Sequence, residues 1–219
     1  MLTPIYELKH NYINVNGFYG GSQNFFKDDK GLFNQNRARS GCGLVAITDT
    51  VCYLRGLHNI TSLDKYKRLF KASSRRSLWI PMRSGITFIQ ETIGLKASLT
   101  ANRLPYKCHW CFRHRYVLDR ISYMLQNDTP VILCIPRTFG LKTHKAILNL
   151  YNDSLSLSSA TSGHFVTVTG LMKDSQTGRL YYRISSWGKI YYISHDEYID
   201  FLRRHPMGLL GNIMLIERV

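Results

Sequence analysis

The sequence predicts an α+β protein, with helices in its first half and antiparallel strands in its second. Between about residues 40 and 127, apolar side chains recur at spacings of three and four, which places them on one face of a helix. Between about residues 128 and 219, short β-branched runs alternate with turn residues, as in antiparallel strands. No repeat, low-complexity tract or linker interrupts the chain. We therefore expect residues 1–219 to form one domain, with a helical lobe packed on a β lobe.

Composition limits the class of protein and the kind of partner. The chain has 219 residues, of which 44% are hydrophobic, enough for a full core. Lys and Arg number 29 against 14 Asp and Glu, a net charge of +15 that attracts polyanions such as nucleic acid or an acidic protein. The basic residues form no basic helix or aromatic-basic repeat, so a generally solvated basic surface explains the charge equally well.

The first residues and the cysteines indicate a compartment. No basic start followed by an apolar stretch opens the chain, and no run approaches the roughly 20 apolar residues of a transmembrane helix. The five cysteines are an odd number without a disulfide framework, which favours a reducing environment. We expect a cytoplasmic protein without a transmembrane segment, although export by another route stays open.

The helical half is predicted element by element. A central helix begins near Cys42 and ends at Gly56, because Leu44, Ile47 and Val51 share one face. Residues 28–39 before it are predicted as a polar loop. Three further helices are predicted over residues 62–70, 84–93 (ended by Gly94) and 116–127.

The β half is predicted from its apolar runs and turns. The expected strands cover residues 131–135, 146–151, 164–171, 180–185, 190–193 and 212–217. A turn at 174–178 makes a hairpin, residues 151–163 are predicted as a loop, and a capping box at 194–197 opens a short helix through Phe201.

Cys42 is the candidate nucleophile. It lies between Gly41 and Gly43 at the expected start of the central helix, where unpaired N–H groups and the helix dipole favour a thiolate. The glycines allow a substrate backbone to come close to the sulfur. A small buried core cysteine is the alternative, and a partner histidine favours the catalytic interpretation.

His164 is the best of eight histidines as that partner. It follows a Ser- and Gly-rich loop and opens a predicted strand. The partner strand ends at Ser185, followed by Ser186-Trp187-Gly188, which can supply a polar side chain beside the imidazole.

These residues resemble the papain-like cysteine peptidases, and most closely the bacteriocin-processing (double-glycine) peptidases and similar bacterial proteins. The matching motifs are Cys42-Gly43, the run Pro130 to Leu133, and the run His164 to Gly170, in order over about residues 20 to 200. The resemblance implies a papain-like fold and a thiol peptidase that acts on a peptide or protein through a Cys42 thiolate and a His164 imidazolium. It departs at Ser185, where the family has Asn or Asp, and in the 21-residue spacing from His164.

The resemblance also implies a glutamine whose amide completes the oxyanion hole. Gln35 and Asn36, seven and six residues before Cys42, have about the expected offset, and Gln23 is the alternative if the intervening loop is an insertion. Asp49 is expected only to decorate the central helix. No cofactor is implied, and the Cys108-His109-Trp110-Cys111 run lacks the second ligand pair of a structural zinc site, so no metal is expected.

Two other functions stay open from the sequence. The same residues can transfer the acyl group to an amine instead of water, which makes an acyltransferase. A papain-like fold without activity can also serve as a basic binding module.

Overall fold

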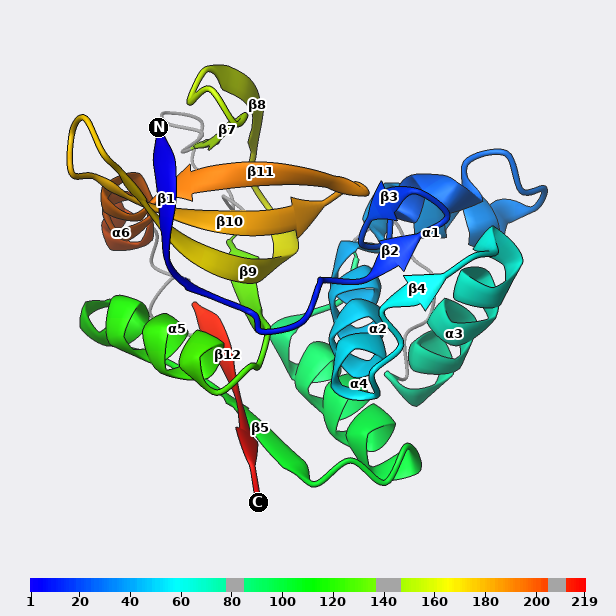
Figure 1. Cartoon of the computed structure of the whole chain (residues 1–219). Helices are drawn as coiled ribbons and strands as arrows, with labels where there is room; N and C mark the ends of the chain where they lie inside the picture. The colour runs from blue at the N-terminus through cyan, green and yellow to red at the C-terminus, as the bar shows by residue number, and fades with distance from the viewer. Residues whose placement is uncertain (78–84, 137–146, 205–211) are drawn as a thin grey trace. The chain divides into compact units, whose positions relative to one another are not determined.

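The computed structural model describes residues 1–77, 85–136, 147–204 and 212–219, and these residues form an α+β structure (Figure 1). The predicted class is confirmed, with six α-helices and two sheets in the described residues. The chain divides into two compact units. The first comprises Met1–Lys9, Trp110–Ile184 and Ile190–Leu215, and the second comprises His10–His109, Ser185–Lys189 and Ile216–Val219.

The first unit is built on a large sheet whose strand order is β12-β6-β9-β10-β11-β7-β8, with β1 also paired to β9. The pairs that β9 makes with β1 and β6 are antiparallel, as are β12 with β6, β11 with β7, and β7 with β8. The strands are β1 (Leu2–Glu7), β6 (Val131–Ile135), β7 (Leu148–Tyr151), β8 (Leu157–Thr161), β9 (His164–Asp174), β10 (Leu180–Ser186), β11 (Lys189–Ser194) and β12 (Ile213–Arg218).

Two helices of this unit pack on its strands. Helix α5 (Val117–Gln126) buries Val117, Ile121 and Leu125, one face of a helix, against β1 and β9. Helix α6 (His195–Arg204) contacts β7. Both helices lie where the sequence predicted them.

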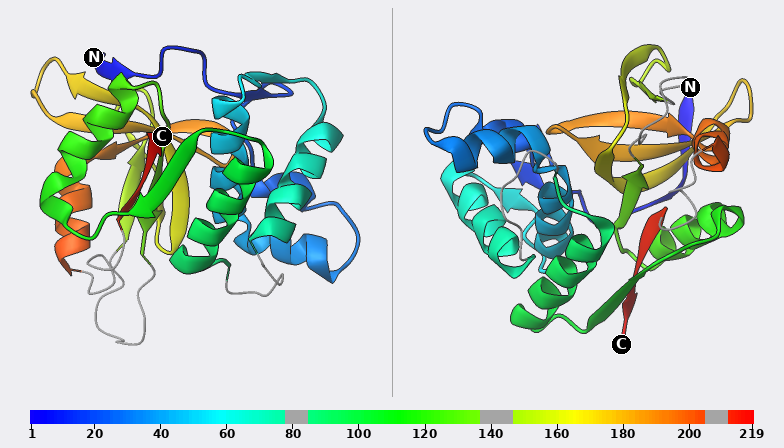
Figure 2. Two further views of the ribbon diagram at one scale, coloured as in Figure 1. Left: turned by 90° about the horizontal axis from the view of Figure 1, so that it is seen from below. Right: turned by 180° about the vertical axis from the view of Figure 1, so that it is seen from behind.

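In the second unit, three of the helices pack side by side (Figure 2). Helix α2 (Cys42–Leu54) buries ten of its 13 residues, because apolar residues occupy most of its surface. Helices α3 (Leu63–Arg76) and α4 (Phe88–Ala101) pack against it and against each other. The remaining elements are α1 (Leu32–Ser40), the 3-10 helix η1 (Gln23–Phe26), the small sheet β3 (Phe18–Tyr19), β2 (Asn14–Val15) and β4 (Asn59–Ile60), and β5 (Tyr106–Trp110), which pairs with β12.

One predicted loop proved to be a helix, and one predicted helix was wrong at its boundaries. Residues 28–39, predicted as a polar loop, contain most of α1, which packs on η1 and whose polar sequence lacks an apolar stripe. Gly94 does not end α4, which starts after its Thr87 cap and continues to Ala101. A Cβ on Gly94 would overlap the Ser77 side chain, so this glycine serves close helix packing.

Six strands were missed: the two-residue strands β2, β3 and β4, and the longer strands β1, β5 and β8. β1 lies in a segment without periodicity, β8 lies in the predicted loop 151–163, and β5 lies in the half predicted to be helical. β8 is largely exposed and pairs only along one described edge, with β7, so it carries little apolar pattern. The start of the strand predicted at 146–151 lies outside the described residues, and the remainder is β7.

Candidate active site

Cys42 is the first residue of α2. The helix is capped by Gly41, whose position has no side-chain hydrogen bond, and its first turn holds no acidic residue. The N–H groups and positive dipole end of this 13-residue helix are therefore directed toward the Cys42 position without a competing anion in that turn. Cys42 is half-buried, so its sulfur combines stabilisation of the thiolate with access.

The other four cysteines differ from Cys42 in burial or position. All five lie in the described part of the chain, and none forms a disulfide. Burial raises the pKa of Cys52 to about 12 and that of Cys108 to about 11, and Cys111 is also buried. Cys134 is half-buried like Cys42 but lies inside strand β6. It is therefore the natural internal control for the reactivity of Cys42.

Of the two predicted glutamines, Gln23 is tied to the chain just before Cys42. Its Nε2 donates to the carbonyl oxygen of Arg39 at 3.4 Å, three residues before Cys42. The amide nitrogen has a second N–H to offer. Its Oε1 is buried without a hydrogen-bond partner in the described structure. Gln35 is exposed on α1, about two helical turns before Cys42.

Asp49 is the residue of α2 whose position the sequence did not predict. It does not decorate the helix surface as expected but is 1% exposed. Its carboxylate accepts hydrogen bonds from the Tyr66 hydroxyl at 2.6 Å, the Tyr12 hydroxyl at 3.2 Å and the Gly21 N–H at 2.8 Å. Burial raises the pKa of Asp49 to about 7, although the three donors favour the ionised form. A lone acid within an otherwise apolar helix was the signal available in the sequence.

The Gly20-Gly21 turn fits closely against this carboxylate. Gly20 has a φ of +78°, and a Cβ there would overlap the Ser185 hydroxyl. A Cβ on Gly21 would overlap the Tyr66 hydroxyl. Two glycines therefore let the turn reach Asp49. Ser22 follows as the cap of η1, which begins with Gln23. The turn therefore fixes the backbone position of Gln23.

Ser185 holds the same turn from the other side. Its Oγ donates to the carbonyl oxygen of Tyr19 at 2.9 Å, and the Tyr19 N–H donates to the Gly188 carbonyl oxygen at 3.0 Å. These bonds fasten the tip of the β10–β11 hairpin to the Gly20-Gly21 turn. The structure thus brings Ser185, Asp49 and the segment leading to Gln23 together within the second unit.

His164 belongs to the first unit, where it begins β9 opposite Ile135 of β6. It is 6% exposed, and burial lowers the pKa of its imidazole to about 4. The ring is therefore neutral at pH 7. Removal of the ring from water disfavours its charged form, and the expected imidazolium stays a prediction.

The Cys108 run shows no metal-binding geometry. Cys108 is buried and His109 is exposed, since neighbouring residues of β5 point to opposite faces. Over the described ranges, no group of three His, Cys, Asp or Glu side chains could hold a metal ion.

The fold and the site define an α+β protein in which a half-buried cysteine opens a buried helix and a glutamine is tied just before it. Comparisons of the chain with protein families, curated proteins and solved structures give no match. Among the described helices, none has the length and apolar character required to cross a bilayer.

Proposed function

We propose that this chain is a thiol-dependent hydrolase of papain-like fold, a cysteine peptidase with Cys42 as its nucleophile and His164 as its base. The observation that carries the proposal is the position of Cys42, half-buried at the first residue of the buried helix α2. The three ordered sequence motifs supply the resemblance to papain-like peptidases, and the α+β class is compatible with it.

The chemistry starts from a neutral imidazole. His164 accepts the Cys42 thiol proton as the sulfur attacks the peptide carbonyl carbon. The imidazolium then donates that proton to the leaving amine as the carbon–nitrogen bond breaks. Water, deprotonated by the imidazole, attacks the thioester and releases the acid and the thiol. Burial lowers the pKa of His164 to about 4, so in the proposal its imidazole accepts the thiol proton only as the sulfur attacks and negative charge develops beside it.

Two side chains assist these steps in the proposal. The second amide N–H of Gln23 and the backbone N–H of Cys42 stabilise the negative oxygen of the tetrahedral intermediate. Ser185 accepts the Nδ1–H of His164 and so leaves Nε2 facing the sulfur. A hydroxyl that already donates to Tyr19 is a stronger acceptor, because hydrogen bonds in a chain polarise one another.

Hydrolysis and acyl transfer differ only in the last step. An amine in place of water would give a new amide, and the residues involved are the same. Product masses therefore decide between them.

The test is cleavage of a proteome-derived peptide library, read by mass spectrometry. We expect defined cleavage by the wild type and by the Cys134→Ala control, and loss of nearly all cleavage in Cys42→Ala and His164→Ala. Cleavage that survives in Cys42→Ala, or no turnover of any peptide by folded wild type, contradicts the proposal.

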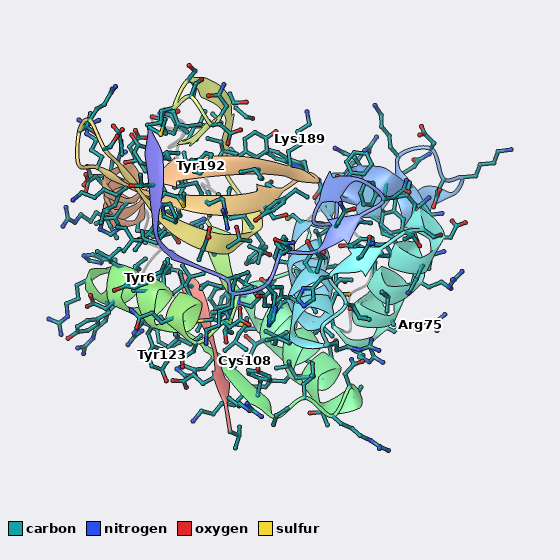
Figure 3. The ribbon with its side chains drawn as sticks, in the orientation of Figure 1. Tyr6, Arg75, Cys108, Tyr123, Lys189 and Tyr192 are labelled. Atoms are coloured by element: carbon teal, nitrogen blue, oxygen red, sulfur yellow. The ribbon has the colours of Figure 1, made fainter. Side chains whose placement is uncertain are left out.

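A second candidate function rests on an aromatic and basic surface in the first unit. The guanidinium carbons of Arg115 and Arg120 lie 4.6 and 5.4 Å from the Tyr116 ring centroid. Nearby in sequence, Phe112 is 57% exposed and Tyr123 is 54% exposed (Figure 3 labels Tyr123 on α5). Exposed rings beside arginines are typical of surfaces that bind single-stranded nucleic acid.

Fluorescence anisotropy with a labelled single-stranded oligonucleotide tests this binding function. We expect binding that weakens steeply with salt and falls in Tyr123→Ala and Arg115→Ala, but not in the Arg203→Ala control on α6. If all three variants weaken oligonucleotide binding equally, the positive charge acts as a general basic surface and not as a dedicated binding site.

A further inference from the structure

The carboxylate of Asp49 is buried in the second unit without a cation beside it. It lies on α2, two helical turns after Cys42, and is 1% exposed. In the described structure its hydrogen bonds all come from neutral donors, the hydroxyls of Tyr66 and Tyr12 and the N–H of Gly21. None of the ion pairs among the described residues includes Asp49. Three neutral donors only partly replace the water that an ion loses on burial, so this carboxyl can hold a proton near neutral pH.

The other titratable groups around Asp49 are neutral near pH 7. They are the phenols of Tyr12 and Tyr66 and the thiol of Cys52, about one turn later on α2, and such groups ordinarily hold their protons at this pH. Two exposed cations lower the pKa of the Cys52 thiol against the larger effect of its burial, and they are Arg55 and Lys65. Burial raises the pKa of Asp49 to about 7, so Asp49 is the member of this cluster that changes charge near neutral pH.

A proton on this carboxyl changes the hydrogen bond that reaches the Gly21 turn. The ionised group accepts the Tyr66 hydroxyl on Oδ1, and the Tyr12 hydroxyl and the Gly21 N–H on Oδ2. A proton on either oxygen adds an O–H that must itself donate, so one tyrosine hydroxyl has to reverse or lose its bond. Hydrogen bonds to an ionised acceptor are about twice as strong as those to a neutral one. The Gly21 N–H is therefore held firmly when Asp49 is ionised and weakly when it is protonated.

The turn that contains Gly21 has little room to replace this bond. A Cβ on Gly21 would overlap the Tyr66 hydroxyl and lie 2.8 Å from Asp49 Oδ1, so the backbone of the turn already lies against both groups. Two residues later η1 begins with Gln23, whose Nε2 donates to the Arg39 carbonyl oxygen at 3.4 Å. A bond of this length is weak, so Gln23 depends on the preceding turn for its position.

We propose that Asp49 is a positioning residue whose proton controls Gln23, because the ionised carboxylate fixes the Gly21 turn and the protonated acid releases it. The inference rests on the proposed peptidase function for the role of Gln23 in the oxyanion hole. Turnover should rise with pH as Asp49 loses its proton. Stability should fall as pH rises from 3.8 to about 7, because the folded state binds the Asp49 proton more tightly than the unfolded chain does. These opposite signs distinguish control of Gln23 from general unfolding.

The Gly21 amide can be observed by itself, because Gly20-Gly21 is the only Gly-Gly pair in the sequence. With glycine labelled by carbon-13 at its carbonyl and nitrogen-15 at its amide, an HNCO spectrum of the full chain shows the Gly21 signal alone. We expect this signal to move downfield with a single midpoint as pH rises from about 5.5 to 8.5, because its hydrogen bond strengthens. Asp49→Asn should abolish the movement. The matched control Asp64→Asn, at an exposed acid of α3, should retain it.

Tyr66→Phe is a second variant that keeps Asp49 in place. It removes a donor that favours the ionised form, so the midpoint of the Gly21 signal should move to higher pH. The movement should be larger than in Tyr12→Phe, because the Tyr66 bond is 2.6 Å long and the Tyr12 bond 3.2 Å. A Gly21 signal that stays in place over this pH range, or that moves equally in Asp49→Asn, overturns the inference.

Turnover of a cleaved peptide gives a second readout. The ratio of kcat in wild type to kcat in Gln23→Ala should grow about tenfold across the Gly21 midpoint, because the glutamine is then held in place. A constant ratio overturns the inference while the peptidase stands. If no peptide is cleaved, the side-chain amide signal of Gln23, assigned by its absence in Gln23→Ala, replaces the ratio. Its movement with the Gly21 midpoint then supports the control of Gln23 and refutes the peptidase, and a static signal overturns the control as well.

Discussion

The carboxylate of Asp49 accepts the backbone N–H of Gly21 at 2.8 Å, and this bond joins the middle of α2 to the turn that precedes Gln23. Helix α2 begins at Cys42, and the Gln23 amide in turn reaches the Arg39 carbonyl oxygen just before that helix. One buried helix therefore fixes both the cysteine and the glutamine. Substitutions of Asp49 and of the two glutamines separate these two contributions.

Replacing Asp49 should impair turnover more than thiol reactivity. In Asp49→Asn, the amide nitrogen or the remaining oxygen cannot satisfy all three donors, so we expect a loss of about 1–3 kcal/mol in unfolding free energy. If the Gly21 turn then shifts Gln23, turnover should fall about tenfold or more, while the alkylation rate of Cys42 changes less than about threefold. Equal falls in both rates would mean that Asp49 supports the whole unit rather than Gln23.

The two glutamines should behave differently. Loss of one oxyanion-hole donor typically lowers kcat by about 100- to 1000-fold, and we expect this effect in Gln23→Ala. Gln35→Ala removes an exposed side chain on α1 and should change kcat by less than about twofold. Steady-state kinetics on one cleaved peptide decides the assignment, and the reverse result would move the oxyanion hole to Gln35.

Ser185→Ala removes the hydrogen bond to Tyr19 and the proposed acceptor for His164. We expect about 1 kcal/mol lower stability and turnover lower by about tenfold to a hundredfold. The matched control is Ser186→Ala, at the neighbouring buried serine, which should leave turnover nearly unchanged. Unchanged kinetics in Ser185→Ala would reduce the site to a Cys42–His164 dyad. Ser185→Asn should destabilise, because Gly20 lies against the Ser185 hydroxyl.

His164 should make stability depend on pH. Burial lowers its pKa from 6.5 to about 4, so the unfolded chain binds more protons there between these values. Its contribution is full above pH 6.5 and is lost as pH falls toward 4, a change of about 3 kcal/mol. Asp49, with a pKa raised from 3.8 to about 7, acts with the opposite sign over an overlapping range.

Urea unfolding at several pH values between 4.5 and 6.5 measures both effects. The stability difference between wild type and His164→Asn should grow with pH, and that between wild type and Asp49→Asn should shrink. A constant difference for His164→Asn would show that its imidazole titrates normally in the folded state.

The sequence predicted the elements whose apolar spacing is regular. Helix α2 and strand β9 were located correctly because their buried faces follow the helical and extended periods. Helix α1 and strand β8 were missed because both are mostly polar and depend on packing or pairing with other segments. The local sequence pattern of a segment does not indicate which distant segments it packs against or pairs with.

The candidate site was predictable only in part for the same reason. Cys42 was found from its flanking glycines and the helix that follows. Asp49 was misjudged because its three donors come from two distant tyrosines and a glycine turn, which the spacing of α2 cannot reveal. The neutral state of His164 follows from burial in the sheet, a tertiary property.

Competitive alkylation of the five cysteines tests the central claim most directly. The folded protein is treated with limiting iodoacetamide at pH 6 to 7, and labelling of each cysteine is followed by mass spectrometry. We predict that Cys42 reacts at least about 100-fold faster than the equally half-buried Cys134, because a helix N-terminus stabilises its thiolate, and that His164→Ala reduces this advantage. Slow labelling of Cys42 at the rate of Cys134 would contradict the account.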